Sequence, residues 1–102
     1  MPTTSKLRIP KERITEFCKK NHIRKLSLFG SALREDFTPD SDVDILVEFD
    51  PKHIPGLITL SGMEIELGEI LGHKVDLRTA QDLSPYFRQE VIDSAEVHYA
   101  EG

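Results

Sequence analysis

The 102-residue sequence is poor in cysteine and has no long apolar run. Cys18 is the only cysteine, so an internal disulfide is excluded. The helical pattern around Cys18 predicts that it packs in a core, which fits a reducing cytoplasm. No apolar run approaches the length of a membrane-spanning helix, and the first residues lack the apolar segment of a secretory signal. We therefore expect a cytoplasmic protein that does not bind membranes.

Positive charge is also scarce. Thirteen lysines and arginines stand against 18 aspartates and glutamates, which gives a net charge of −5. The basic residues cluster only mildly, at Lys19-Lys20 and Arg24-Lys25. Broad binding to a nucleic-acid backbone needs clustered positive charge, so we expect none. A nucleotide whose phosphates are bridged by a cation remains compatible with this composition.

The length predicts a single domain over residues 1–102 with one modest core, preceded by a mobile polar stretch at residues 1–8. Apolar periodicity and turn residues predict an α/β (α+β) chain, with a short strand or docking tail near its end. The expected helices cover residues 10–20, 31–36, 57–71 and one that begins at Pro85 with Phe87, Val91 and Ala95 facing inward. The expected strands cover residues 23–29, 42–49 and 73–78.

Asp42 and Asp44 lead directly into the apolar run Ile45 to Phe49. Residues i and i+2 of a strand project from the same face, so these two carboxylates point the same way if the segment is extended. Like charges raise the cost of ionising each other, and a hard divalent cation such as Mg²⁺ removes that cost. Taken alone, the pair favours the simpler interpretation of solvated acids that protect a strand edge.

Gly30-Ser31 ends the preceding apolar run. Glycine lets the backbone approach a ligand closely, and exposed N–H groups at the start of a helix attract anions. An isolated Gly-Ser would be an ordinary turn. Next to Asp42 and Asp44, however, it predicts a site for a metal-bound polyphosphate.

The order Gly30-Ser31, ten residues, Asp42-Val43-Asp44 resembles the signature of the polymerase-beta-like nucleotidyltransferase superfamily. The fuller pattern also includes Arg34, Lys74 to Leu77 and Leu83 to Pro85. It is similar to the small prokaryotic branch, the minimal nucleotidyltransferase (MNT) proteins, which are commonly paired with HEPN-domain toxins. The resemblance implies a small mixed β-sheet of three to four strands flanked by helices.

The same resemblance implies the roles of individual residues. Asp42, Asp44 and Asp76 would be catalytic and would hold metal, with two Mg²⁺ ions expected. Gly30, Ser31 and Arg34 would bind the nucleotide. From the residues alone, Arg34 could equally pair with an acid of the loop, and Asp76 could simply face solvent.

The resemblance further implies an antitoxin that transfers AMP from ATP to a tyrosine of a cognate HEPN ribonuclease toxin and so neutralises it. Two alternatives stay open. One is a catalytically weak antitoxin that only covers the toxin. The other is nucleotidyl transfer to a small molecule or an RNA end. No residue in the sequence selects adenine over another base, so ATP rests on the resemblance.

Overall fold

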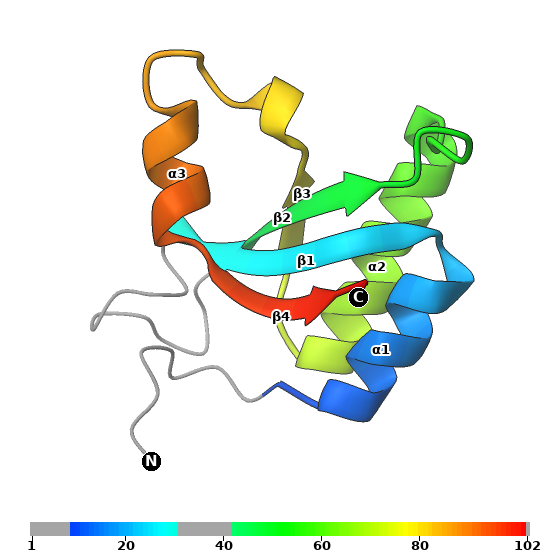
Figure 1. Ribbon diagram of the computed structural model, residues 1–102. Helices are drawn as coiled ribbons and strands as arrows, with labels where there is room; N and C mark the ends of the chain where they lie inside the picture. The colour runs from blue at the N-terminus through cyan, green and yellow to red at the C-terminus, as the bar shows by residue number, and fades with distance from the viewer. Residues whose placement is uncertain (1–8, 31–41, 102) are drawn as a thin grey trace.

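The computed structural model describes residues 9–30 and 42–101 (Figure 1). Several expectations lie outside these described residues. They are the mobile stretch over 1–8, the helix over 31–36, and the side chains of Ser31 and Arg34.

Three α-helices, one 3₁₀ helix and four strands make up the described chain (Figure 1). In chain order they are α1 (Lys11–Lys20), β1 (Ile23–Phe29), β2 (Val43–Phe49), α2 (Leu57–Leu71), β3 (Val75–Arg78), η2 (Ala80–Asp82), α3 (Arg88–Ser94) and β4 (Glu96–Ala100). The strands form one sheet in the order β3-β2-β1-β4. The expected mixed sheet flanked by helices is confirmed, and the end of the chain is a strand rather than a tail.

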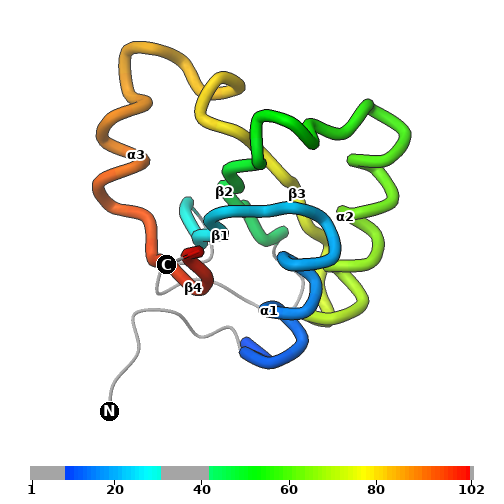
Figure 2. The backbone as a smooth tube through the Cα atoms, turned by 45° about the vertical axis from the view of Figure 1, so that its right-hand side comes forward, coloured from blue at the N-terminus to red at the C-terminus, as the bar shows by residue number. Residues whose placement is uncertain are grey.

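The sheet is mixed, with two antiparallel strand pairs and one parallel pair. β1 runs antiparallel to both β2 and β4, whereas β2 and β3 are parallel. Parallel neighbours need a crossover connection, and α2 supplies it. Figure 2 shows the sheet between two layers, with α1 and α2 on one side and α3 on the other. Among the described helices, none is long and apolar enough to cross a membrane.

The hydrophobic core lies between the sheet and the helix pair α1 and α2. Alternate residues of the strands face these helices and are almost fully buried, because a strand points successive side chains to opposite sides. The buried core residues of the strands and helices are Ile14, Phe17, Cys18, Ile23, Leu26, Leu28, Val43, Ile45, Val47, Phe49, Met63, Leu67, Leu71, Val75 and Leu77.

Helix α2 has the predicted bounds, and its predicted stop is confirmed. Gly72 follows the helix with φ of +72°, the left-handed conformation that glycine favours at a helix end. Gly68 allows close packing, since a Cβ at this position would lie 2.8 Å from the carbonyl oxygen of His73. Gly62 meets nothing within 4 Å, so no such contact requires glycine there.

The last helix begins later than predicted. It starts at Arg88 rather than at Pro85, because a turn in which the Phe87 N–H bonds to the Ser84 carbonyl precedes it. The Arg88 side chain fixes this start by donating to the carbonyls of Ala80 and Leu83. As a result Phe87 is half exposed rather than inward, while Ala95 is half-buried. The third strand also begins two residues late, at Val75.

Candidate functional site

The side of the sheet that faces away from α1 and α2 carries most of the polar side chains of the strands. We call it the open face. On β2 the buried Val43, Ile45 and Val47 alternate with Asp44, Leu46 and Glu48. The strand registers extend this second set across the sheet to Lys25, Ser27 and Phe29 of β1, and to Asp76 and Arg78 of β3.

Asp44 and Asp76 are direct register partners in the parallel pair of β2 and β3. Neighbouring strands are about 4.8 Å apart, so the two side chains leave the same face from adjacent positions. Both are half-buried. Asp42 is exposed and lies one residue before β2, where the Val43 N–H donates to the Lys74 carbonyl at 2.8 Å. The sequence-predicted acids therefore lie at one end of two adjoining strands.

Gly30 brings the bend after β1 to the same place. Phe29, the last residue of β1, is the register partner of Asp44. Gly30 has φ of +66°, and a Cβ built on it would lie 2.6 Å from Asp44 Oδ2. The Gly30 backbone thus passes so close to the Asp44 carboxylate that any side chain at position 30 would have to displace it.

The described residues also allow a test of whether the site suits a metal ion. Among the residues of 9–30 and 42–101, no three His, Cys, Asp or Glu side chains are gathered so that they could hold one. Mg²⁺, however, usually takes only one or two protein carboxylates and completes its oxygen shell with substrate phosphates and water. The paired carboxylates of Asp44 and Asp76 match that donor set.

Glu64 on α2 supports the strand that carries Asp76. Its Oε2 accepts a hydrogen bond from the Leu77 N–H at 2.8 Å. β3 is an edge strand, so without Glu64 this N–H would have no neighbouring strand to bond to. A helix residue that caps a strand 13 positions away leaves no local signal in the sequence, and sequence reasoning missed it.

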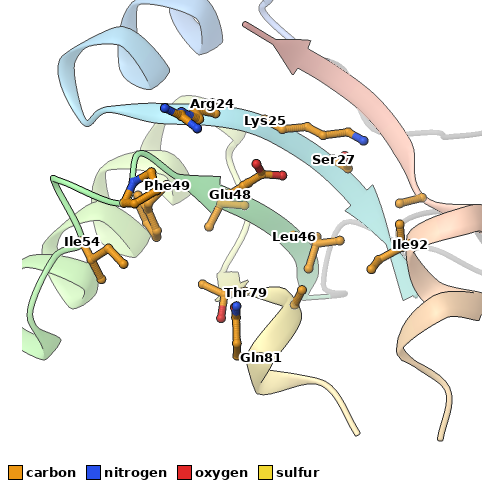
Figure 3. A pocket seen from close by; sticks show the side chains of 14 residues that line it. Arg24, Lys25, Ser27, Leu46, Glu48, Phe49, Ile54, Thr79, Gln81 and Ile92 are labelled. Atoms are coloured by element: carbon orange, nitrogen blue, oxygen red, sulfur yellow. The ribbon is translucent and has the colours of Figure 1, made fainter. Parts of the chain in front are cut away.

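A cleft of about 550 Å³ opens on the same face (Figure 3). Its floor includes Ser27 of β1 and Leu46 of β2, with Lys25 and Glu48 in the next pair of positions. The sides come from Thr79 to Gln81, from Ile92 and Ala95, and from Pro51 and Ile54. Glu48 is exposed at the end of β2, and it also lines the cleft.

Two other groups have no part in the site. Burial raises the pKa of the Cys18 thiol to about 12, which suits an inert core residue. His22 and His53 stack with ring centroids 3.8 Å apart, and the Asp50 carboxylate pairs with His53. A hydrogen bond from the Lys52 N–H, more than the nearby Arg24, lowers the pKa of Asp50.

A mixed sheet with α1 and α2 on one side, and paired aspartates beside a glycine bend on the other, defines a nucleotidyltransferase-type domain. The chain belongs to the nucleotidyltransferase domain family, whose sequence model matches residues 11–98. Protein adenylyltransferase MntA of Thermococcus cleftensis is 44% identical over 70 residues, which cover 69% of each chain.

Solved structures agree with this assignment. A protein described as a candidate minimal nucleotidyltransferase superposes with a TM-score of 0.68 at 28% identity, covering 83% of this chain and 85% of that one. The MNT antitoxin complex with a tri-AMPylated Shewanella oneidensis HEPN toxin gives a TM-score of 0.58 at 21% identity. It covers 88% of this chain and 69% of that one, and its likeness extends to the fold alone.

Proposed function

We propose that this chain is an antitoxin that transfers AMP from ATP to a tyrosine hydroxyl of a cognate HEPN ribonuclease toxin. The observation that carries the proposal is the register pairing of Asp44 with Asp76 beside the bend at Gly30. The similarity to protein adenylyltransferase MntA supports AMP as the transferred group. The fold likeness to an MNT antitoxin bound to an AMPylated HEPN toxin supports the partner.

The paired carboxylates suit a metal-bound triphosphate. Asp42 and Asp44 would hold one Mg²⁺ on the triphosphate, and Asp44 with its register partner Asp76 would hold a second ion, each ion completing its shell with phosphate and water oxygens. When bound, these ions would neutralise phosphate charge and lower the pKa of the attacking hydroxyl. The Gly30 backbone would lie against the terminal phosphates, because a residue without a side chain permits that approach. Ser31 and Arg34 would help to bind the same phosphates.

The transfer itself needs no protein nucleophile. The tyrosine oxygen attacks the α-phosphorus of ATP, the bond from that phosphorus to the bridging oxygen breaks, and pyrophosphate leaves. The tyrosine proton passes to solvent. The chain contributes by holding the reacting groups in line and by excluding other orientations, which is the main role of a protein in phosphoryl-type transfer. The free thiol of Cys18 supports a reducing cytoplasm as the setting.

Incubation with labelled ATP, Mg²⁺ and the purified product of the adjacent gene, which we expect to be a HEPN toxin, tests the proposal. We expect label on a tyrosine of the toxin, and we expect it to disappear with Asp44→Ala. A tight complex without label, and neutralisation that survives Asp44→Ala, would instead support an antitoxin that only covers the toxin. Label on added RNA or on an aminoglycoside, with none on the toxin, would support nucleotidyl transfer to an RNA end or a small molecule.

A further inference from the structure

The cleft on the open face lies directly beside the paired acids. Asp44, Leu46 and Glu48 occupy successive positions on the same side of β2, and the last two line the cleft. Same-side neighbours in a strand are about 6.6 Å apart. A group bound in the cleft would therefore contact Leu46, the same-side neighbour of Asp44 on β2.

Exposed apolar residues follow the cleft residue Ile54 along the chain. Ile54 lines the cleft and is 70% exposed, and the first two residues of α2, Leu57 and Ile58, are 83% and 91% exposed. Three large aliphatic side chains within five residues of chain are left in water. Such a group of exposed apolar residues at the edge of a cleft is typical of a protein-docking surface.

We propose that the cleft and this apolar surface, Ile54, Leu57 and Ile58, dock the protein acceptor of the reaction through an apolar segment that bears the acceptor hydroxyl. The inference rests on the proposed function and adds the surface on which the acceptor binds. The molecule that binds this surface is a protein, because a nucleoside small enough for the cleft would leave Leu57 and Ile58 uncovered.

The lining of the cleft matches such a segment. Leu46, Ile92 and Ala95 offer an apolar wall to an aromatic or aliphatic side chain. Lys25 and Glu48 are register partners on the open face and offer one charge of each sign (Figure 3). A segment with apolar residues at its centre and charged residues beside them would meet both features, which is the usual anatomy of a protein interface.

A pair of matched variants tests the docking surface. Ile54→Ser changes a residue that is 70% exposed at the cleft, and Ile65→Ser makes the same change at a residue that is 68% exposed on α2 and does not line the cleft. Ile65 lies eight residues after Leu57, about 12 Å further along the helix axis. Both side chains are in water, so neither change should affect folding, which thermal denaturation checks.

The measurement is the affinity of each variant for the immobilised HEPN toxin without nucleotide, so that no transfer can occur. We expect Ile54→Ser to weaken binding by about 10-fold or more, and Ile65→Ser by less than about 2-fold. Equal affinities for the two variants, or no binding by the wild-type chain, would overturn the inference. Binding that depends on Ile54 without AMP transfer in the full reaction would retain the surface and reject the proposed function.

A further variant shows whether the cleft binds the protein acceptor or the nucleoside. Ile92→Ser changes a cleft residue on α3, and we expect it to weaken toxin binding while leaving the affinity for AMP-PNP unchanged. If Ile92→Ser instead weakens AMP-PNP binding and leaves toxin binding intact, the cleft holds the nucleoside and the inference is wrong.

Discussion

The two faces of the sheet are built from alternate residues of the same strands, yet they carry opposite chemistry. The covered face presents Val43, Ile45 and Val47 to α1 and α2, and all three are buried. The open face presents Asp44, Leu46 and Glu48. Stability should therefore depend on one set of side chains and reactivity on the other, although the two sets are one residue apart.

The largest effect that we expect comes from a substitution on the open face alone. Asp44→Asn removes a charge that the proposed metal nucleotide needs, so AMP transfer should fall by about 1,000-fold. The melting temperature should change little, because Asp44 is only half-buried and asparagine has nearly the same volume as aspartate. Labelled-ATP transfer and thermal denaturation measure the two quantities. Asp93→Asn, the same change at an exposed position of α3, is the control and should leave both unchanged.

The reverse experiment substitutes a residue of the covered face. Ile45 is fully buried and adjacent to Asp44 in the chain. Ile45→Ala should lower the free energy of unfolding by about 3 kcal/mol through lost burial and a residual cavity. Transfer per folded molecule, measured well below the melting temperature, should stay within about 2-fold. A variant as stable as the wild type in urea denaturation would mean that the two faces are not divided as described.

Gly30 affects both stability and AMP transfer, since its backbone lies against Asp44. Gly30→Ala combines a φ of +66° with a Cβ placed 2.6 Å from Asp44 Oδ2. Displacement of that carboxylate should reduce AMP transfer by about 10- to 100-fold, and strain should cost about 1 kcal/mol of stability. Gly62→Ala is the matched control, because its Cβ would meet nothing within 4 Å. It should raise stability by about 0.5–1 kcal/mol and leave transfer unchanged.

A smaller effect should follow from the hydrogen bond that links α2 to β3. Glu64→Ala leaves the Leu77 N–H without its acceptor and should cost about 1 kcal/mol of unfolding free energy. Glu64→Gln keeps an acceptor oxygen and should recover most of that loss. Glu69→Ala on the exposed side of α2 serves as the control. Equal stability of the alanine and glutamine variants at position 64 would argue against this support for β3.

The smallest effect at neutral pH concerns Cys18 in the core. Its pKa is raised from 9.0 to about 12 by burial, so the folded protein holds the thiol proton more tightly than the unfolded chain does. This contribution is complete below pH 9 and is lost as the pH rises from 9 toward 12. Between pH 8 and pH 10 the wild type should lose about 1 kcal/mol more unfolding free energy than Cys18→Ala. Parallel losses in the two proteins would contradict the buried thiol.

Much of this division could be predicted from the sequence. Alternation over residues 43–49 identified β2 and set Asp44 apart from its apolar neighbours, and apolar periodicity identified the helix over residues 57–71. The residue chemistry also placed a glycine bend near two acids. These features depend on neighbours in the chain, which a sequence displays directly.

The rest depends on packing between distant segments. The pairing of Asp44 with Asp76 follows from the register that α2 imposes on β3, and no local pattern encodes that register. The cleft requires α3, η2 and the loop at Ile54 to meet over β1 and β2. The late start of α3 depends on the Arg88 hydrogen bonds to Ala80 and Leu83, which override the helix-start signal of Ser84-Pro85.

The most direct test of the proposed site counts metal ions on its acids. Mn²⁺ can replace Mg²⁺, and electron paramagnetic resonance measures how many ions the chain binds in the presence of AMP-PNP. We expect two bound ions for the wild type and at most one for Asp76→Asn, with the melting temperature preserved. Two ions in both proteins, bound with equal affinity, would contradict a role for Asp76 beside Asp44.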